Sequence, residues 1–244
     1  MINNIVIKKA VLFLLQLFWF SLGLFICAFS VVLILESNLG LGPWDVFHIS
    51  MTNYIPLTFG QVNIATGLLC VIIAYPMGIK PNFGTILNML MGGIFIDFIM
   101  KANLIPPTIT YLQQYSYLFV GIFCFGLGTG TYISANMGTG PRDSLMMGLH
   151  RSTGRSIGLV RTILEVLVVT LGFLLGGKIG LGTLIFSFTI GWFTQMFLAL
   201  YYWIGRQSWF TKWLHLLTSE EVNVKVKKQN LTRVFFKKCR RMKR

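Results

Sequence analysis

The feature that most constrains the fold is one short motif that occurs twice, each time after a long apolar run. Residues 38–45 are NLGLGPWD and residues 136–143 are NMGTGPRD. Gly40 of the first copy matches Gly138 of the second, an offset of 98 residues (138 minus 40). The offset continues without a gap through further pairs: Asp45 with Asp143, Gly60 with Gly158, Lys80 with Lys178, and Gly93 with Gly191. The sequence therefore predicts two copies of one structural unit.

The apolar runs indicate a membrane protein. The chain is 55% hydrophobic and 11% charged, whereas a soluble domain contains about 25% charged residues. A helix needs about 20 apolar residues to cross a hydrocarbon core of about 30 Å. Runs of this kind cover residues 10–35, 60–79, 84–100, 116–135, 157–177 and 182–204. Because lipid offers no hydrogen-bond partners to the backbone, we expect an all-α, polytopic helical membrane protein.

Two segments are too short and too polar to match these runs. Residues 43–56 and 141–155 each contain an Asp and a His, and each follows a copy of the motif. We expect a short amphipathic or re-entrant helix at each place, so each repeat has about three spans plus one broken helix. An odd number of spans places the second repeat upside down relative to the first.

The distribution of basic residues favours this inverted topology. Cytoplasmic loops of membrane proteins collect Lys and Arg. The loop at 36–59 has neither, whereas the loop at 134–157 has Arg142, Arg151 and Arg155. The alternative is eight spans, in which the short helices cross the membrane and the repeats are parallel. Under the six-span interpretation both termini lie in the cytoplasm of a cell-membrane protein.

Four segments follow from this interpretation. Residues 1–9 form a cytoplasmic N-terminus, residues 10–103 the first membrane repeat, and residues 116–205 the second. Residues 206–244 form a cytoplasmic tail with twelve basic and two acidic residues, and its first part has the pattern of an interfacial amphipathic helix. We expect this tail to bind anionic lipid headgroups of the bilayer. Nothing in it indicates base recognition, so we expect no nucleic acid partner.

The repeated motif has both a structural and a functional interpretation. Glycine permits positive φ and close backbone approach, and proline suits the first position of a helix. Aspartate in the first turn interacts favourably with the positive helix end. However, broken helices at repeat interfaces also bind solutes and ions in secondary transporters. The substrate-binding hypothesis therefore names Gly40, Gly42, Pro43, Asp45, Gly138, Gly140, Pro141 and Asp143.

Two further charged residues lie within an apolar run of the second repeat. Arg161 and Glu165 are one helical turn apart, and their counterparts in the first repeat are Asn63 and Gly67. They form either a self-neutralising structural pair or a gating and coupling pair, because charges inside membrane segments are rare and often functional.

Other kinds of site have little support in the sequence. The three histidines have no second His or Cys at a metal-ligand spacing, and the four cysteines form no CxxC motif. We therefore expect no metal and no cofactor. No nucleophile–base pair or phosphate-binding loop is recognisable, so we do not expect an enzyme.

The motifs taken together resemble a known family. The segments SNLGLGPWDVF and ANMGTGPRDSL, with the turns GIKPNFGT and GGKIGLGT, are similar to the bacterial YczE/YyaS/YitT-type integral membrane proteins. The resemblance covers about residues 10–204, and the long basic tail is not part of it. It implies a bacterial cytoplasmic-membrane protein and transfers no catalytic residue or ligand to this chain.

These observations favour a transporter of an unknown small solute, with its site at the two motifs and with Arg161 and Glu165 biasing one gate. The alternative is a non-transporting membrane accessory or regulatory protein that acts through a partner protein, which the basic tail favours.

Overall fold

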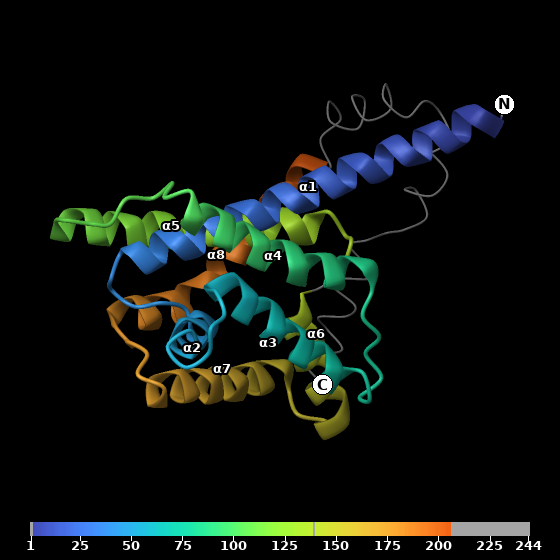
Figure 1. Cartoon of the computed structure of the whole chain (residues 1–244). Helices are drawn as coiled ribbons and strands as arrows, with labels where there is room; N and C mark the ends of the chain where they lie inside the picture. Colours follow the sequence, from blue (N-terminus) through green and yellow to red (C-terminus); the bar gives the residue numbers. More distant parts are fainter. Residues whose placement is uncertain (1, 139, 206–244) are drawn as a thin grey trace. The chain divides into compact units, whose positions relative to one another are not determined.

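The computed structural model describes residues 2–138 and 140–205, with side chains from residue 10 onward. The expected tail at 206–244 lies outside the described residues. Regular structure in the described part is entirely α-helical, which confirms the predicted fold class (Figure 1). The helices are α1 (Ile2–Glu36), α2 (Pro43–Met51), α3 (Phe59–Ala74), α4 (Phe83–Lys101), α5 (Tyr111–Ser134), α6 (Pro141–Thr153), α7 (Ile157–Leu174) and α8 (Leu181–Gly205).

Five of the described helices are long and apolar enough to cross a membrane. They are Ala10–Glu36 within α1, together with α4, α5, α7 and α8. The run at 60–79, which we expect to be a full span, forms only the 16-residue helix α3. Pro76 follows closely after α3 and has no backbone N–H to continue the helical hydrogen bonds, and Gly78 then adopts φ 82°. At 1.5 Å per residue α3 covers about 24 Å, less than a typical hydrocarbon core.

Local sequence signals account for the helix starts. Pro43 and Pro141 occupy the first positions of α2 and α6, where a proline leaves no extra backbone group unsatisfied. Thr58 and Thr110 form capping boxes with the glutamines three residues later, at the starts of α3 and α5. Gly154 ends α6 with φ 67°, the left-handed geometry common after a helix.

Corresponding helices start at the offset found in the sequence. Helices α2, α3 and α4 begin at residues 43, 59 and 83, and α6, α7 and α8 begin 98 residues later, at 141, 157 and 181. The short helices exchange partners, because α2 packs against α7 and α6 packs against α3 (Figure 1). Helix α7 follows α6 in the chain but packs against α2, and helix α3 follows α2 but packs against α6.

All of the packing described below lies within one compact unit, Gln16–Tyr201. Close backbone approach joins α5 to two neighbours in this unit. A Cβ added at Gly128 would lie 2.7 Å from the Gly23 carbonyl oxygen of α1, and one at Gly126 would lie 2.5 Å from the Phe193 Cβ of α8. Small residues at such contacts let helices associate closely in lipid. This unit holds the residues of the candidate site.

Candidate functional site

The two motifs form two helix breaks with the same backbone geometry. We call residues 38–42 the first break and residues 136–140 the second. Asn38 and Asn136 both have φ 56°, while Gly40 has φ 114° and Gly138 has φ 147°. Asparagine tolerates the left-handed region better than most residues, and the glycines adopt a conformation that side chains disfavour. The duplicated sequence thus encodes a duplicated turn.

Each break docks onto the start of a long helix in the other half of the chain. The Gly182 N–H at the start of α8 donates to the Leu39 carbonyl oxygen at 2.8 Å. At Gly40 an added Cβ would lie 2.7 Å from the Thr183 Oγ1. In the second break, a Cβ at Gly138 would lie 2.6 Å from the Asn82 Nδ2, next to the start of α4. Gly40 and Gly138 therefore allow each break to pack closely against the neighbouring helix start.

A cavity of about 380 Å³ lies between the two breaks. It brings together eight of the ten residues singled out in the sequence: Gly42, Pro43, Asp45, Gly140, Pro141, Asp143, Arg161 and Glu165. Gly40 and Gly138 do not line it. The volume falls within the range of small-molecule sites. Two arginines and three carboxylates line the cavity, a concentration of charge that is unusual inside a membrane domain.

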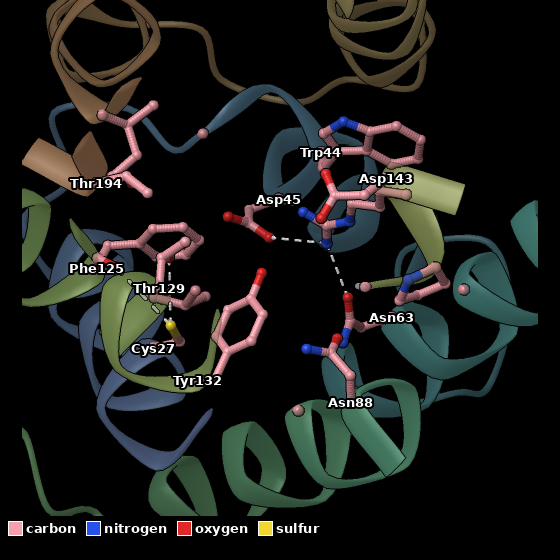
Figure 2. Close-up of a pocket in the computed structure, with 18 of the residues that line it drawn as sticks. Cys27, Trp44, Asp45, Asn63, Asn88, Phe125, Thr129, Tyr132, Asp143 and Thr194 are labelled. Atoms are coloured by element: carbon pink, nitrogen blue, oxygen red, sulfur yellow. Dashed lines mark hydrogen bonds and ion pairs between the residues drawn. The ribbon is translucent and has the colours of Figure 1, made fainter. Parts of the chain in front are cut away.

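Arg142 connects the two halves across the cavity. Its Nη2 donates to the Asn63 Oδ1 at 2.9 Å and lies 3.8 Å from the Asp45 Oδ1. The guanidinium carbon is 5.0 Å from the centre of the Trp44 ring, which is cation–π geometry. Asp45 is 5% exposed, so its carboxylate is removed from solvent and has Arg142 as a nearby cation. Dashed lines in Figure 2 mark the contacts of Arg142 with Asp45 and Asn63.

Further polar side chains complete the lining. Asn63 and Asn88 come from α3 and α4, Thr129 and Tyr132 from α5, and Thr194 and Gln195 from α8. In Figure 2 Asp45, Tyr132 and Asn88 point toward a shared space. The motif analysis did not single out Arg142 or Tyr132 as site residues. The available signal for Arg142 was an arginine at the motif position where the other copy has Trp44.

His48 lies behind Asp45, on the same helix and outside the cavity. Its side chain is fully buried, and neither ring nitrogen has a hydrogen-bond partner within the described residues. The His48 Nδ1 is 3.6 Å from the Asp45 Oδ1, the oxygen that also faces Arg142. A buried polar group without a partner costs about 1–3 kcal/mol, so this arrangement calls for a physical reason.

Arg161 and Glu165 both reach the cavity from α7. The Arg161 Nε donates to the Glu165 Oε1 at 2.8 Å, one helical turn apart, as their spacing predicts. The side chains are 51% and 27% exposed. The side chains of this pair are therefore more exposed to solvent than those of Arg142 and Asp45.

The two halves differ where their last two helices meet. Between α3 and α4, Gly60 and Gly93 lie in backbone contact, and a Cβ on either would collide with the other's carbonyl oxygen. The counterparts Gly158 and Gly191 would meet no heavy atom within 4 Å. We call these places the α3–α4 seam and the α7–α8 seam. The first is closed at these glycines, and the second is open.

Asp97 of α4 forms hydrogen bonds across the closed seam to the start of α3. Its Oδ1 accepts a 2.8 Å hydrogen bond from the Gly60 N–H, and its Oδ2 accepts one from the Thr58 hydroxyl. The carboxylate therefore satisfies groups at the start of α3. Its counterpart 98 residues later, Gln195, lines the cavity.

The described side chains offer no cluster of metal ligands. Within residues 2–138 and 140–205, no group of three or more His, Cys, Asp or Glu side chains is arranged to hold a metal ion. The polar groups of the cavity are charged side chains, amides and hydroxyls.

Comparison with known proteins supports membrane localisation. The chain is 39% identical over 177 residues to "Uncharacterized membrane protein YczE" of Bacillus subtilis (strain 168), covering 71% of this chain and 80% of that protein. It is 34% identical to an "Uncharacterized protein" of Haemophilus influenzae, over 69% of this chain and 76% of that one. It is 26% identical to "Uncharacterized protein YyaS" of B. subtilis, over 68% and 84% respectively.

No solved structure matches the chain. A family model matches residues 14–199, which include both breaks and all of the cavity-lining residues. This match and the relatives above confirm the resemblance inferred from the two motifs. The chain is an integral membrane protein and belongs to the family described as "Family of unknown function (DUF6198)".

Proposed function

We propose that the protein transports a small polar solute across the cell membrane through the cavity between its two breaks. The cavity supports this proposal because it collects the charged and amide side chains of helices whose remaining surface is largely apolar. Broken helices that meet at a repeat interface are a recurring solution for solute binding in secondary transporters. No chemical conversion of the solute is part of the proposal.

The difference between the two seams is the observation that carries the proposal. Two copies of one unit should be able to exchange conformations, because each has the glycines that closed packing requires. The α3–α4 seam is closed at Gly60 and Gly93, while the α7–α8 seam is open at Gly158 and Gly191. A second state with the α7–α8 seam closed and the α3–α4 seam open would turn the cavity toward the opposite face. That exchange is alternating access.

Within this proposal the residues of the two motifs have distinct tasks. Asp45 and Asp143, with the neighbouring backbone of Gly42 and Gly140, contact the solute. Arg161 and Glu165 lie on α7 beside the open seam and bias the gate there. Both termini lie in the cytoplasm, where the tail at 206–244 binds anionic lipid headgroups.

A test of alternating access needs no knowledge of the solute. Thr194 lines the cavity, so Thr194→Cys in a background lacking the four native cysteines places one thiol there. In oriented proteoliposomes, we expect a membrane-impermeant maleimide to modify this thiol from either side. A cavity that can be labelled from one side only would contradict transport and favour the accessory-protein alternative.

Cross-linking tests the proposed second state directly. We expect the Gly158→Cys/Gly191→Cys double variant to form a disulfide on oxidation, because closure brings the two positions together as at Gly60 and Gly93. Oxidation should then restrict labelling of Thr194→Cys to one side, and reduction should restore labelling from both. The two single cysteine variants serve as controls, since neither can form an intramolecular bridge. Absence of the disulfide in the double variant would overturn the exchange of seams.

A further inference from the structure

The cavity also points to a class of solute and to a coupling ion. We propose that it binds a small carboxylate on Arg142, and that Asp45 takes up one proton as the carboxylate enters. This inference rests on the proposed transport function, because it names what the same cavity moves. It is carried by the surroundings of Arg142, Asp45 and His48.

Arg142 has unused capacity to bind an anion. A guanidinium has five N–H donors, and within the described residues Arg142 donates one hydrogen bond, to Asn63. The approach to Asp45 is 3.8 Å, longer than a direct hydrogen bond. The Trp44 ring beneath the guanidinium and the amide of Asn63 fix its position, while 32% of the side chain stays exposed at the cavity. A carboxylate matches such a planar fork with two parallel hydrogen bonds.

Binding of a carboxylate changes the electrostatic environment of the Asp45 carboxylate. The solute would share the positive charge that now faces the Asp45 carboxylate, which is 5% exposed. The other charged groups at the cavity are Asp143 from α6 and the Arg161–Glu165 pair from α7, and α3 contributes the uncharged Asn63 and Gly67. With its cation engaged elsewhere, a buried carboxylate is more stable when protonated.

His48 is placed to accept the resulting hydrogen bond. Its Nδ1 is 3.6 Å from the Asp45 oxygen that faces Arg142, and neither ring nitrogen makes a hydrogen bond to any of the residues that the structure describes. A protonated Asp45 has an O–H to donate, and a small rotation brings it within hydrogen-bond distance of a neutral imidazole nitrogen. The group that is unsatisfied in the solute-free state therefore gains a partner in the bound state.

The charges balance in this step. One carboxylate adds one negative charge to the cavity, and one proton from water adds one positive charge on the Asp45 Oδ1. No covalent bond other than this O–H bond forms, and no electron is transferred. When the solute leaves, Asp45 returns its proton to water and faces Arg142 again.

Proton uptake on binding tests the proposal without a transport measurement. Purified full-length protein in weakly buffered detergent solution is mixed with sodium lactate, and a pH indicator reports proton uptake. Propane-1,2-diol is the matched probe, because it has lactate's carbon chain with an alcohol in place of the carboxylate. We expect about one proton taken up per lactate bound and none with the diol. Thermal shift, measured in parallel, reports whether each probe binds.

Variants then assign the residues. Asp45→Asn should bind lactate with no proton uptake, and Arg142→Gln should lose at least tenfold in lactate affinity. Arg151→Gln, which changes an exposed arginine at the end of the same helix, is the matched control and should behave as wild type. His48→Phe, which removes the acceptor, should lower the number of protons taken up per lactate bound, whereas His150→Phe, at a half-buried position that does not line the cavity, should not change it.

The outcomes separate this inference from the transport proposal. Binding of lactate without proton uptake overturns the coupling, and equal binding of lactate and the diol overturns the carboxylate class. In either case Thr194→Cys can still be labelled from both sides, and transport of another solute stands. If lactate binds with proton uptake but Thr194→Cys is labelled from one side only, the inference holds and transport fails.

Discussion

The two breaks have similar backbone conformations, but the side chains that follow them differ. Both have a left-handed Asn, a left-handed Gly, a proline at the first helical position and an aspartate two residues later. Where the first has Trp44, the second has Arg142, and these two side chains contact each other. The two motifs therefore differ in chemistry at the place where their side chains meet.

The two seams likewise have matching glycines but different surroundings. Both seams retain their glycine pair, yet only Gly60 and Gly93 are in contact. Asp97 reinforces the closed seam, whereas the counterpart Gln195 faces the cavity. The two glycine pairs, which are 98 residues apart, therefore have different surroundings. The predictions below test this contrast.

The largest expected effect concerns the side of the membrane on which each short helix ends. Tyr54 follows α2 and Ser152 lies near the end of α6, 98 residues later, and both are exposed. In a cysteine-free background we expect Tyr54→Cys to react with an impermeant maleimide from outside the cell and Ser152→Cys from the cytoplasm. Reaction of both from the same side would replace inverted repeats with the parallel, eight-span arrangement.

The second prediction compares equivalent glycines. Gly60→Ala should destabilise the protein by about 1–3 kcal/mol or more, because its Cβ would collide with backbone of α4 and lie 2.7 Å from the Asp97 Cγ. Gly158→Ala meets open space and should be neutral or stabilising by up to about 1 kcal/mol, since alanine favours helix. Thermal unfolding in detergent measures both. Equal losses would show that the seams are packed alike.

Much of the fold follows from local sequence, and the reasons are specific. Apolar run lengths and capping residues determine where helices begin, and the 98-residue offset places α6 to α8 once α2 to α4 are known. Helix α3 is shorter than expected because the apolar pattern continues through Pro76, which has no backbone N–H to continue the helix, and on to Gly78, which has φ 82°. Composition alone does not register that break.

The site was less predictable because it depends on contacts between the copies. The motif indicated the two aspartates, and the charges within an apolar run indicated Arg161 and Glu165; all four residues line the cavity. The contact of Arg142 with Trp44 requires the exchange of partners between short helices, and no local pattern encodes that exchange. The burial of His48 depends on the rings of Phe47 and Phe59, of which Phe59 lies on another helix.

A third prediction tests the Asp97 contact against its counterpart. Asp97→Ala removes the acceptor of the Gly60 N–H and the Thr58 hydroxyl, so it should cost about 1–2 kcal/mol, as for loss of a helix cap. Gln195→Ala should cost less, because Gln195 faces the cavity. Thermal unfolding of the two variants gives the comparison. A larger loss for Gln195→Ala would reverse the assignment of the reinforced seam.

A fourth prediction concerns the charges that join the two breaks. Arg142→Gln leaves Asp45 buried beside no close cation and should lower thermal stability, whereas the exposed Arg151→Gln should not. Adding Asp45→Asn to Arg142→Gln should recover part of the loss. The coupling energy from this double-mutant cycle should be about 0.5–3 kcal/mol. Additive effects would show that the two residues do not interact across the breaks.

The smallest effect should come from the charged pair that has no counterpart in the first half. Arg161 and Glu165 lie on one helix and are 51% and 27% exposed, so water and ions in the cavity screen their attraction. Arg161→Gln should therefore change the free energy of unfolding by about 0.3–0.5 kcal/mol, less at high salt. Because Asn63 and Gly67 occupy the equivalent positions, this pair is not required by the packing that the halves share. A loss as large as that of Arg142→Gln, measured by thermal unfolding at low and high salt, would instead make the pair a structural support of α7.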